Sequence, residues 1–195
     1  MEAPGQFIGQ QPLSYIDRLG SRNHNDINMI VIHCTELPDL DTARHWGEKL
    51  VHSESRTGNS GHFYIDRDGK TEEWVPANRI AHHVRGHNPK SIGIELVNSG
   101  RYPDWFHSLH QHMSEPYPDE QIEALGLLLN LLAEQIPELE LLAGHEDLDT
   151  DLLPADDNPE ILIKRKLDPG PQFPWKTLLS RVPLRRIGTE PVGKI

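Results

Sequence analysis

Two apolar segments of the chain lead to histidines, and they constrain the fold more than any other feature of the sequence. Residues 28–34 are a run rich in β-branched side chains that ends on His33, and residues 139–143 form a shorter run that leads to His145. Runs of this length and composition are typical of buried strands. The sequence therefore predicts a central sheet in which two strands deliver imidazoles at their ends.

Helical patterns alternate with these extended segments. Residues 41–51 predict a helix capped by Asp41, and residues 118–136 predict the longest helix because their apolar residues recur at helical spacing. The remaining predicted elements are a hairpin over residues 62–75, a strand over residues 91–97 and a short helix over residues 175–179. Interleaved strands and helices predict an α/β fold, with one central mixed β-sheet flanked by helices.

The length of the chain, 195 residues, is that of a single domain able to bury a sizeable core. Residues 1–27 are polar and Gly-rich with little periodicity, which indicates an extended N-terminal arm. We expect the domain itself to span residues 28–182 and a loosely attached C-terminal tail to span residues 183–195.

The charge and cysteine content exclude several classes of function. The net charge is −11, from 30 acidic and 19 basic residues, and no Lys/Arg-rich block is present, so no nucleic-acid partner is expected. The single cysteine, Cys34, excludes an internal disulfide and a Cys-rich zinc site. No leader-like segment and no apolar run of membrane-spanning length appears, so we expect a cytoplasmic protein without membrane insertion, or a periplasmic or cell-wall protein if a leader was removed. The sequence does not predict an oligomeric state.

A metal site is predicted from His33, His145 and Asp168, the last in the turn-like segment 166–171. Two imidazoles and one carboxylate form a ligand set that binds zinc (Zn²⁺) and leaves a fourth position for water, in a surface groove at one end of the sheet. Each residue alone has a simpler explanation: the chain has 12 histidines, and an aspartate before a Pro-Gly-Pro segment often begins a turn. The three residues indicate a site only as a set.

Two further residues have side chains that could assist hydrolysis at a carbonyl carbon, one as a general base and one as a stabiliser of the oxyanion. Glu95 interrupts the apolar segment 91–97, and burial would raise the pKa of its carboxyl toward the range of a general base. Lys166 precedes Asp168 by two residues, so in an extended segment both side chains point to the same side, where an ammonium could stabilise an oxyanion. The alternative for Lys166 is an ordinary surface lysine in the basic patch 164–166.

Other hydrolase classes find little support. Cys34 and His33 are adjacent in a predicted strand and point to opposite faces, so they do not form a catalytic pair easily. The chain also contains no His-Glu-x-x-His segment of the kind that binds zinc on a helix in metallopeptidases.

Five blocks of the sequence together resemble the zinc-dependent N-acetylmuramoyl-L-alanine amidases of the second amidase type, a superfamily that includes phage amidase lysozymes and peptidoglycan recognition proteins. The blocks follow the family's order from about residue 28 to residue 175 and lie at residues 30–35, 61–69, 91–96, 143–145 and 166–171. Five blocks in one order are far more specific than any single block.

The resemblance implies a role for each candidate. His33, His145 and Asp168 match the zinc ligands, Glu95 matches the acidic residue that assists the water, and Lys166 matches the lysine beside the oxyanion. The implied reaction is hydrolysis of the amide between N-acetylmuramic acid and L-alanine in peptidoglycan or its soluble muropeptide fragments. Because non-catalytic relatives lose the third ligand, Asp168 favours an enzyme over the alternative, a non-catalytic muropeptide-binding module.

The chain departs from the family before the strand at residues 91–97. Many relatives have a Trp-His-Ala-Gly segment there, whereas this chain has His82-His83-Val84-Arg85, so the substrate wall is expected to differ. The residues expected to contact substrate are His83, Arg85, Asn88 and Trp74.

Two insertions, residues 101–117 and 149–163, could reshape the groove. The first contains His107, His110 and His112, for which a solvated loop is favoured over adventitious metal binding.

Overall fold

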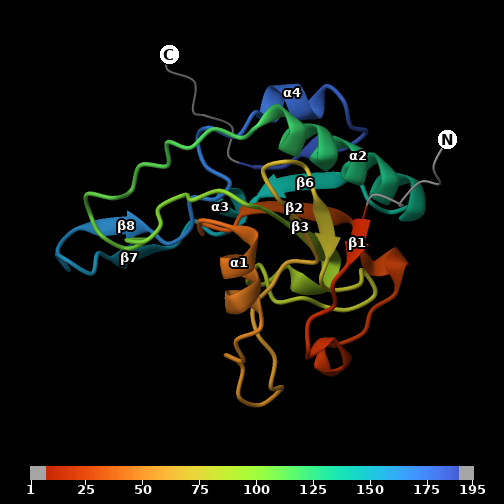
Figure 1. Cartoon of the computed structure of the whole chain (residues 1–195), viewed down its shortest axis with the longest axis horizontal. Helices are drawn as coiled ribbons and strands as arrows, with labels where there is room; N and C mark the ends of the chain where they lie inside the picture. Colours follow the sequence, from red (N-terminus) through yellow and green to blue (C-terminus); the bar gives the residue numbers. More distant parts are fainter. Residues whose placement is uncertain (1–7, 189–195) are drawn as a thin grey trace.

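A seven-stranded mixed sheet forms the centre of the computed structural model, which describes residues 8–188 (Figure 1). The strand order is β1-β4-β3-β5-β2-β6-β9. The strands are β1 (Ile8–Gln10), β2 (Met29–Cys34), β3 (Phe63–Ile65), β4 (Thr71–Glu73), β5 (Ser91–Leu96), β6 (Leu141–Gly144) and β9 (Arg185–Arg186). Strands β3, β5, β2, β6 and β9 run parallel, while β4 is antiparallel to β3 and parallel to β1.

Helices cover both faces of this sheet, and a separate hairpin stands at its side (Figure 1). The α-helices are α1 (Leu40–Gly47), α2 (Asp119–Gln135), α3 (His145–Leu148) and α4 (Trp175–Leu179). Three short 3-10 helices lie at Ile16–Arg18, His24–Asp26 and Asn88–Lys90. The hairpin consists of the antiparallel strands β7 (Leu152–Pro154) and β8 (Leu162–Lys164). The described part of the chain is thus the α/β fold with a mixed sheet that the sequence predicts.

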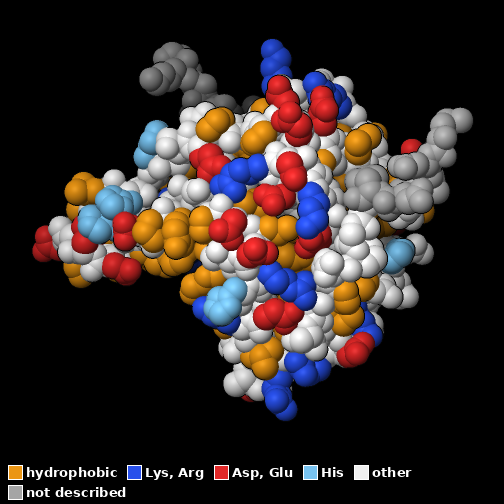
Figure 2. All heavy atoms as spheres, in the orientation of Figure 1, with side chains coloured by type: hydrophobic (Ala, Val, Ile, Leu, Met, Phe, Trp, Pro, Cys, Tyr) orange, Lys and Arg blue, Asp and Glu red, His pale blue; other side chains and the backbone are white. Residues whose placement is uncertain are grey.

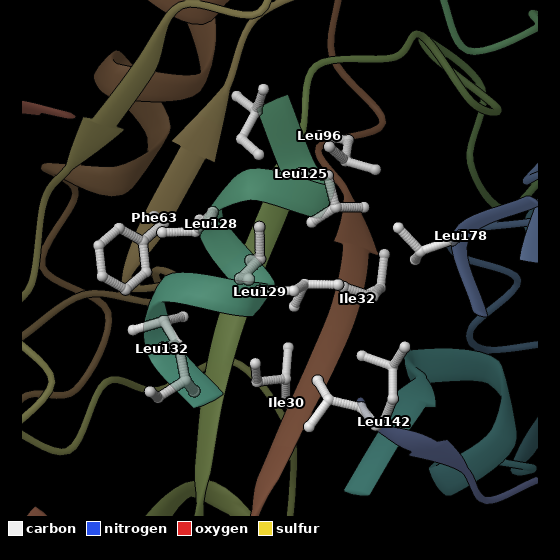
Figure 3. Close-up of a cluster of buried hydrophobic side chains, with 14 of the residues drawn as sticks. Ile30, Ile32, Phe63, Leu96, Leu125, Leu128, Leu129, Leu132, Leu142 and Leu178 are labelled. Atoms are coloured by element: carbon white, nitrogen blue, oxygen red, sulfur yellow. The ribbon is translucent and has the colours of Figure 1, made fainter. Parts of the chain in front are cut away.

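The main core lies between the sheet and α2 (Figure 3). Ile30 and Ile32 of β2 point to this face because alternate residues of a strand share a face, and they meet Leu125 and Leu129 of α2. All four side chains are fully buried. Burial of each contributes roughly 1.5–3 kcal/mol to the folded state. This layer holds β2 rigid, and β2 carries His33.

The opposite face of the sheet carries the residues of the candidate site. Val31 and His33 of β2 point there, since they alternate with Ile30 and Ile32. A second buried cluster, which includes Leu40 and Ala43 of α1, Tyr64 of β3 and Trp74, covers part of this face. The rings of Tyr64 and Trp74 stack with their centroids 3.5 Å apart.

The predicted helix at residues 41–51 forms, with two corrections. It begins at Leu40 and is capped by Asp39, whose Oδ1 accepts a hydrogen bond from the Thr42 backbone N–H at 2.7 Å; the prediction of Asp41 as the cap was therefore wrong. The helix ends at Gly47 rather than at residue 51. The other predicted strands and helices are confirmed to within three residues at their ends.

The expected extended arm is packed into the domain over its described part. Residues 8–10 add strand β1 to the sheet, and Leu13, Tyr15 and Leu19 are buried against α1 and Trp74. Their wide spacing hides them from a search for helical or strand periodicity. Residues 1–7 lie outside the described residues.

The expected tail also begins inside the sheet. Strand β9 pairs with β6, and Leu184 is buried, so residues 183–188 belong to the domain, while residues 189–195 lie outside the described residues. None of the helices within residues 8–188 is long and apolar enough to cross a membrane.

The insertion at residues 149–163 forms the β7–β8 hairpin together with Lys164, and this hairpin projects from the body of the domain (Figure 1). Figure 2 shows apolar and acidic side chains gathered on this projection. Leu152 and Leu162 are more than half exposed there.

A buried ion pair joins the other insertion to the turn that follows His33, and further hydrogen bonds join it to the segment that precedes Asp168. Arg101 is 3% exposed and donates from Nε and Nη2 to the two carboxylate oxygens of Glu36, at 2.6 and 2.7 Å. Its Nη1 and Nη2 also donate to the carbonyls of Lys164 and Arg165. Arg101 therefore links the turn after β2 to the segment that leads to Asp168.

Arg101→Ala should destabilise the protein by about 3–5 kcal/mol, because it leaves the Glu36 carboxylate buried without its partner. The free energy of unfolding, measured by urea denaturation of both proteins, gives this loss. Arg85→Ala is the matched control, since Arg85 pairs with Asp151 on the surface and its removal should cost at most about 1 kcal/mol. Equal losses in the two variants would show that the buried pair does not anchor these segments.

Candidate active site

The three predicted metal ligands meet at the carboxyl ends of β2 and β6. Ile32 of β2 lies opposite Gly144 of β6, so the following residues, His33 and His145, are neighbours. Asp168 reaches them from the segment after β8. In open sheets with parallel strands, ligands bind at this edge because the strand ends and the loops that follow them converge there.

The donor atoms of these residues converge on one point. His33 Nδ1 lies 3.0 Å and His145 Nδ1 lies 3.1 Å from the same carboxylate oxygen, Oδ2 of Asp168. One possible ligand atom from each residue lies within 4.8 Å of the others, and all three residues are buried. The second carboxylate oxygen, Asp168 Oδ1, is also buried and has no hydrogen-bond partner within residues 8–188. Two imidazole nitrogens and a carboxylate, desolvated together, fit a divalent transition metal such as zinc.

The electrostatics of the cluster favour ligand-competent protonation states. Burial lowers the pKa of His33 to about 4, so the imidazole is neutral at neutral pH. Burial opposes ionisation of Asp168, but His145, Lys166 and His33 outweigh it and hold the pKa of this carboxyl well below its usual range. The site therefore presents a neutral imidazole and a carboxylate, which are the forms that bind a metal.

Glu95 lies beside the cluster on the same face of the sheet, because β5 pairs in parallel with β2 and places Glu95 opposite His33. Gly61 makes room for it, since a Cβ at Gly61 would approach Glu95 Cγ to 2.8 Å. The side chain is partly exposed to the pocket. Desolvation, followed by the nearby charge of Asp168, raises the pKa of Glu95 to about 8, while Lys166 lowers it. A carboxyl with such a pKa can take up and release a proton near neutral pH.

Lys166 differs from its basic neighbours, Lys164 and Arg165, in its surroundings. It lines the pocket together with Glu95 and Asp168, as its two-residue spacing from Asp168 predicts. Lys164 is exposed, and Arg165 pairs with Asp149 through both Nε and Nη2. The segment is thus not a uniform solvated patch, and only Lys166 brings an ammonium without a described carboxylate partner to the cluster.

A pocket of about 610 Å³ contains all five predicted catalytic and metal residues. Its far wall includes Trp46 and Lys49 from α1 and the residues after it, with Lys49 Nζ 3.3 Å from the centroid of the Trp46 ring. Sequence reasoning missed Trp46, because no local pattern assigns an exposed tryptophan on a short helix to a cleft.

Three of the four residues expected to contact substrate line the pocket, and the fourth is buried in the core. Arg85 is exposed at the rim of the pocket, where it pairs with Asp151 at 3.1 Å. His83 and Asn88 also line the pocket, although their hydrogen bonds are to the protein. Trp74 was wrongly expected to contact substrate: it is fully buried, and its Nε1 donates to Glu72. It follows β4 directly, and its ring turns into the core.

The three histidines of the first insertion do not join a metal cluster. Within residues 8–188, His33, His145 and Asp168 form the one group whose ligand atoms lie close enough to hold an ion. His110 pairs instead with Asp104 at 2.8 Å on the surface.

The chain is similar to a known family of proteins and to individual relatives. The family model for N-acetylmuramoyl-L-alanine amidase matches residues 23–171. The 1,6-anhydro-N-acetylmuramyl-L-alanine amidase AmpD of Haemophilus influenzae is 25% identical over 182 residues, which cover 82% of this chain and 85% of AmpD. The N-acetylmuramoyl-L-alanine amidase AmiD of Escherichia coli is 33% identical over 125 residues, which cover 58% of this chain and 39% of AmiD.

Solved structures share the fold. The complex of E. coli AmiD with anhydro-N-acetylmuramic acid-L-Ala-D-gamma-Glu-L-Lys superposes with a TM-score of 0.60 at 24% identity, over 83% of this chain and 60% of that one. The match of the family model over most of the chain is decisive: the protein belongs to the N-acetylmuramoyl-L-alanine amidase family.

The raised pKa of Glu95 predicts a pH-dependent effect of Glu95→Gln on the metal-free protein. Between the ordinary pKa of 4.5 and the folded-state value of about 8, the unfolded chain ionises Glu95 before the folded chain does, so wild-type stability falls as the pH rises through this window. Glu95→Gln removes this loss and should gain on the order of 2 kcal/mol relative to wild type between pH 5 and pH 9.

Urea unfolding of chelator-treated protein at both pH values measures this gain. Glu123→Gln, on the exposed side of α2, is the control for loss of a carboxylate. A stability difference between wild type and Glu95→Gln that stays constant with pH would contradict the raised pKa.

Proposed function

We propose that this protein is a zinc-dependent amidase that hydrolyses the bond between N-acetylmuramic acid and L-alanine in muropeptides. The observation that carries the proposal is the convergence of His33 Nδ1 and His145 Nδ1 on Asp168 Oδ2, with Glu95 and Lys166 in the same pocket. His33, His145 and Asp168 would hold the ion and leave one side of it open to the pocket.

Zinc, when bound, would supply a water molecule of lowered pKa and polarise the scissile carbonyl. Glu95 accepts the proton of the attacking water and passes it to the nitrogen of L-alanine as the carbon–nitrogen bond breaks, which yields the lactyl carboxylate and the free amine. Lys166 donates to the carbonyl oxygen as negative charge develops there. Cys34 takes no part, because it points to the α2 face of the sheet.

The substrate class follows from the pocket and from the relatives. The pocket lining includes Lys49, Arg85 and Arg165. Arg85 and Arg165 pair with Asp151 and Asp149, so Lys49 is the cation among them that suits a carboxylate of the substrate, as peptide stems have. AmpD of H. influenzae is named for a 1,6-anhydro sugar substrate, and the AmiD complex contains an anhydro-muramyl peptide. We therefore propose soluble anhydro-muropeptides as substrates in addition to peptidoglycan.

Mass spectrometry of products tests the proposal. Zinc-loaded protein incubated with a soluble anhydro-muramyl peptide or with purified sacculi should release free peptides that begin with L-alanine, and chelation should stop the release until zinc is restored. Glu95→Gln should keep the fold and lower turnover by about 10²–10⁴-fold, because the amide cannot accept the proton. Intact substrates after incubation with zinc-loaded wild type would leave a muropeptide-binding module as the better description.

A second kinetic prediction separates Lys166 from Lys164. Lys166→Ala should lower kcat by on the order of 10²–10³-fold with little change in KM, because its interaction strengthens mainly in the transition state. Lys164→Ala is the matched control, since its side chain is exposed and lies outside the pocket. Small and equal losses in steady-state kinetics of both variants would remove Lys166 from the mechanism.

A further inference from the structure

A chain of hydrogen bonds runs from His33 away from the ligand cluster. His33 Nε2 lies 3.0 Å from Nδ1 of His83, and His83 Nε2 lies 3.2 Å from Oγ of Ser91. Ser91 Oγ in turn donates to the carbonyl oxygen of His87 at 2.9 Å. Ser91 is fully buried, so no water competes for its hydroxyl. The chain therefore ends on a backbone group that can only accept.

This end point fixes the position of every proton in the chain. The single hydroxyl proton of Ser91 is used on the carbonyl of His87, so Ser91 Oγ must accept from His83 Nε2. A neutral His83 with its proton on Nε2 has a lone pair on Nδ1, which accepts the proton of His33 Nε2. His33 then keeps a lone pair on Nδ1, the atom 3.0 Å from Asp168 Oδ2, and this lone pair and the carboxylate would both be directed at a bound metal ion.

The packing around His83 holds its ring in this place. The ring lies against Gly93 of β5, where a Cβ would approach its nearest ring atoms to 2.6 Å, so only glycine leaves the space. Asn88 Oδ1 accepts from the backbone N–H groups of His83 and Val84, at 3.1 and 2.8 Å. The backbone and the ring of His83 are thus both fixed by neighbouring residues.

We infer that His83, supported by Ser91, is a positioning residue that holds the tautomer and orientation of His33 for metal binding. The inference rests on the metal site of the proposed function. It replaces the expected role of His83 in substrate binding, since both of its ring nitrogens are engaged within the protein. Partners of this kind orient metal-binding histidines, and their loss typically weakens metal affinity by about 10–100-fold.

Zinc competition against a chromophoric chelator tests the inference without any activity measurement. His83→Ala should weaken zinc binding by about 10–100-fold. His83→Asn should recover most of the affinity, because its Oδ1 can accept the His33 Nε2 proton. Ser91→Ala should cause a smaller loss. His82→Ala is the matched control, because the ring of His82 packs on His52, with ring centroids 4.5 Å apart, and is not part of this hydrogen-bond chain; its zinc affinity should equal that of wild type.

Nitrogen-15 NMR of the histidine rings supplies a readout that a purely structural role would not move. His83 should carry its proton on Nε2 in the metal-free wild type, and Ser91→Ala should abolish this preference while the far-UV circular dichroism stays unchanged. Equal zinc affinity of wild type and a folded His83→Ala, or a proton on His83 Nδ1, would overturn the inference. A wild type that binds no zinc would instead overturn the proposed metal site, and the tautomer measurement would still decide the state of His83.

Discussion

The parallel pairing of β2 with both β5 and β6 is the constraint on which the site depends. This register places Glu95 beside His33 and brings His145 to the same level at the end of β6. A shift of one residue in either pairing would turn these side chains to the opposite face, because side chains alternate along a strand. The layer of leucines and isoleucines between α2 and the sheet makes such a shift costly, since the same slip would expose the apolar face (Figure 3).

The pocket places several ionisable side chains where they are largely removed from water, which disfavours their charged forms. Asp168 and Glu95 share one site, and burial acts against ionisation of both; Asp168 remains a carboxylate because two imidazoles and Lys166 surround it. Lys166 also lowers the pKa of Glu95, but burial and the charge of Asp168 outweigh it, so this pKa rises to about 8. Their neighbours therefore give the two carboxyl groups very different pKa values. Asp168 stays ionised and suits metal binding, whereas Glu95 suits proton transfer.

The insertions have a structural role as well as a place at the rim. Arg101 of the first insertion holds the turn after β2 and the segment before Lys166 in one buried network. The second insertion adds the β7–β8 hairpin, and Asp151 just before this hairpin pairs with Arg85 at the edge of the pocket. Loops outside the family's sequence blocks therefore anchor the segments that flank these blocks.

The sequence by itself determined the elements and the chemistry. Runs of apolar and β-branched residues predicted the strands and the hairpin, and helical spacing predicted α2. The residue types of His33, His145, Asp168, Glu95 and Lys166 predicted a metal hydrolase. The tertiary structure alone decided the rest: the burial of Trp74, the packing of residues 8–20 into the domain, and the use of both His83 nitrogens within the protein. These features depend on contacts between residues far apart in the chain, such as Ser91 with His83 and Arg101 with Glu36, and no local periodicity records which distant group satisfies a buried donor.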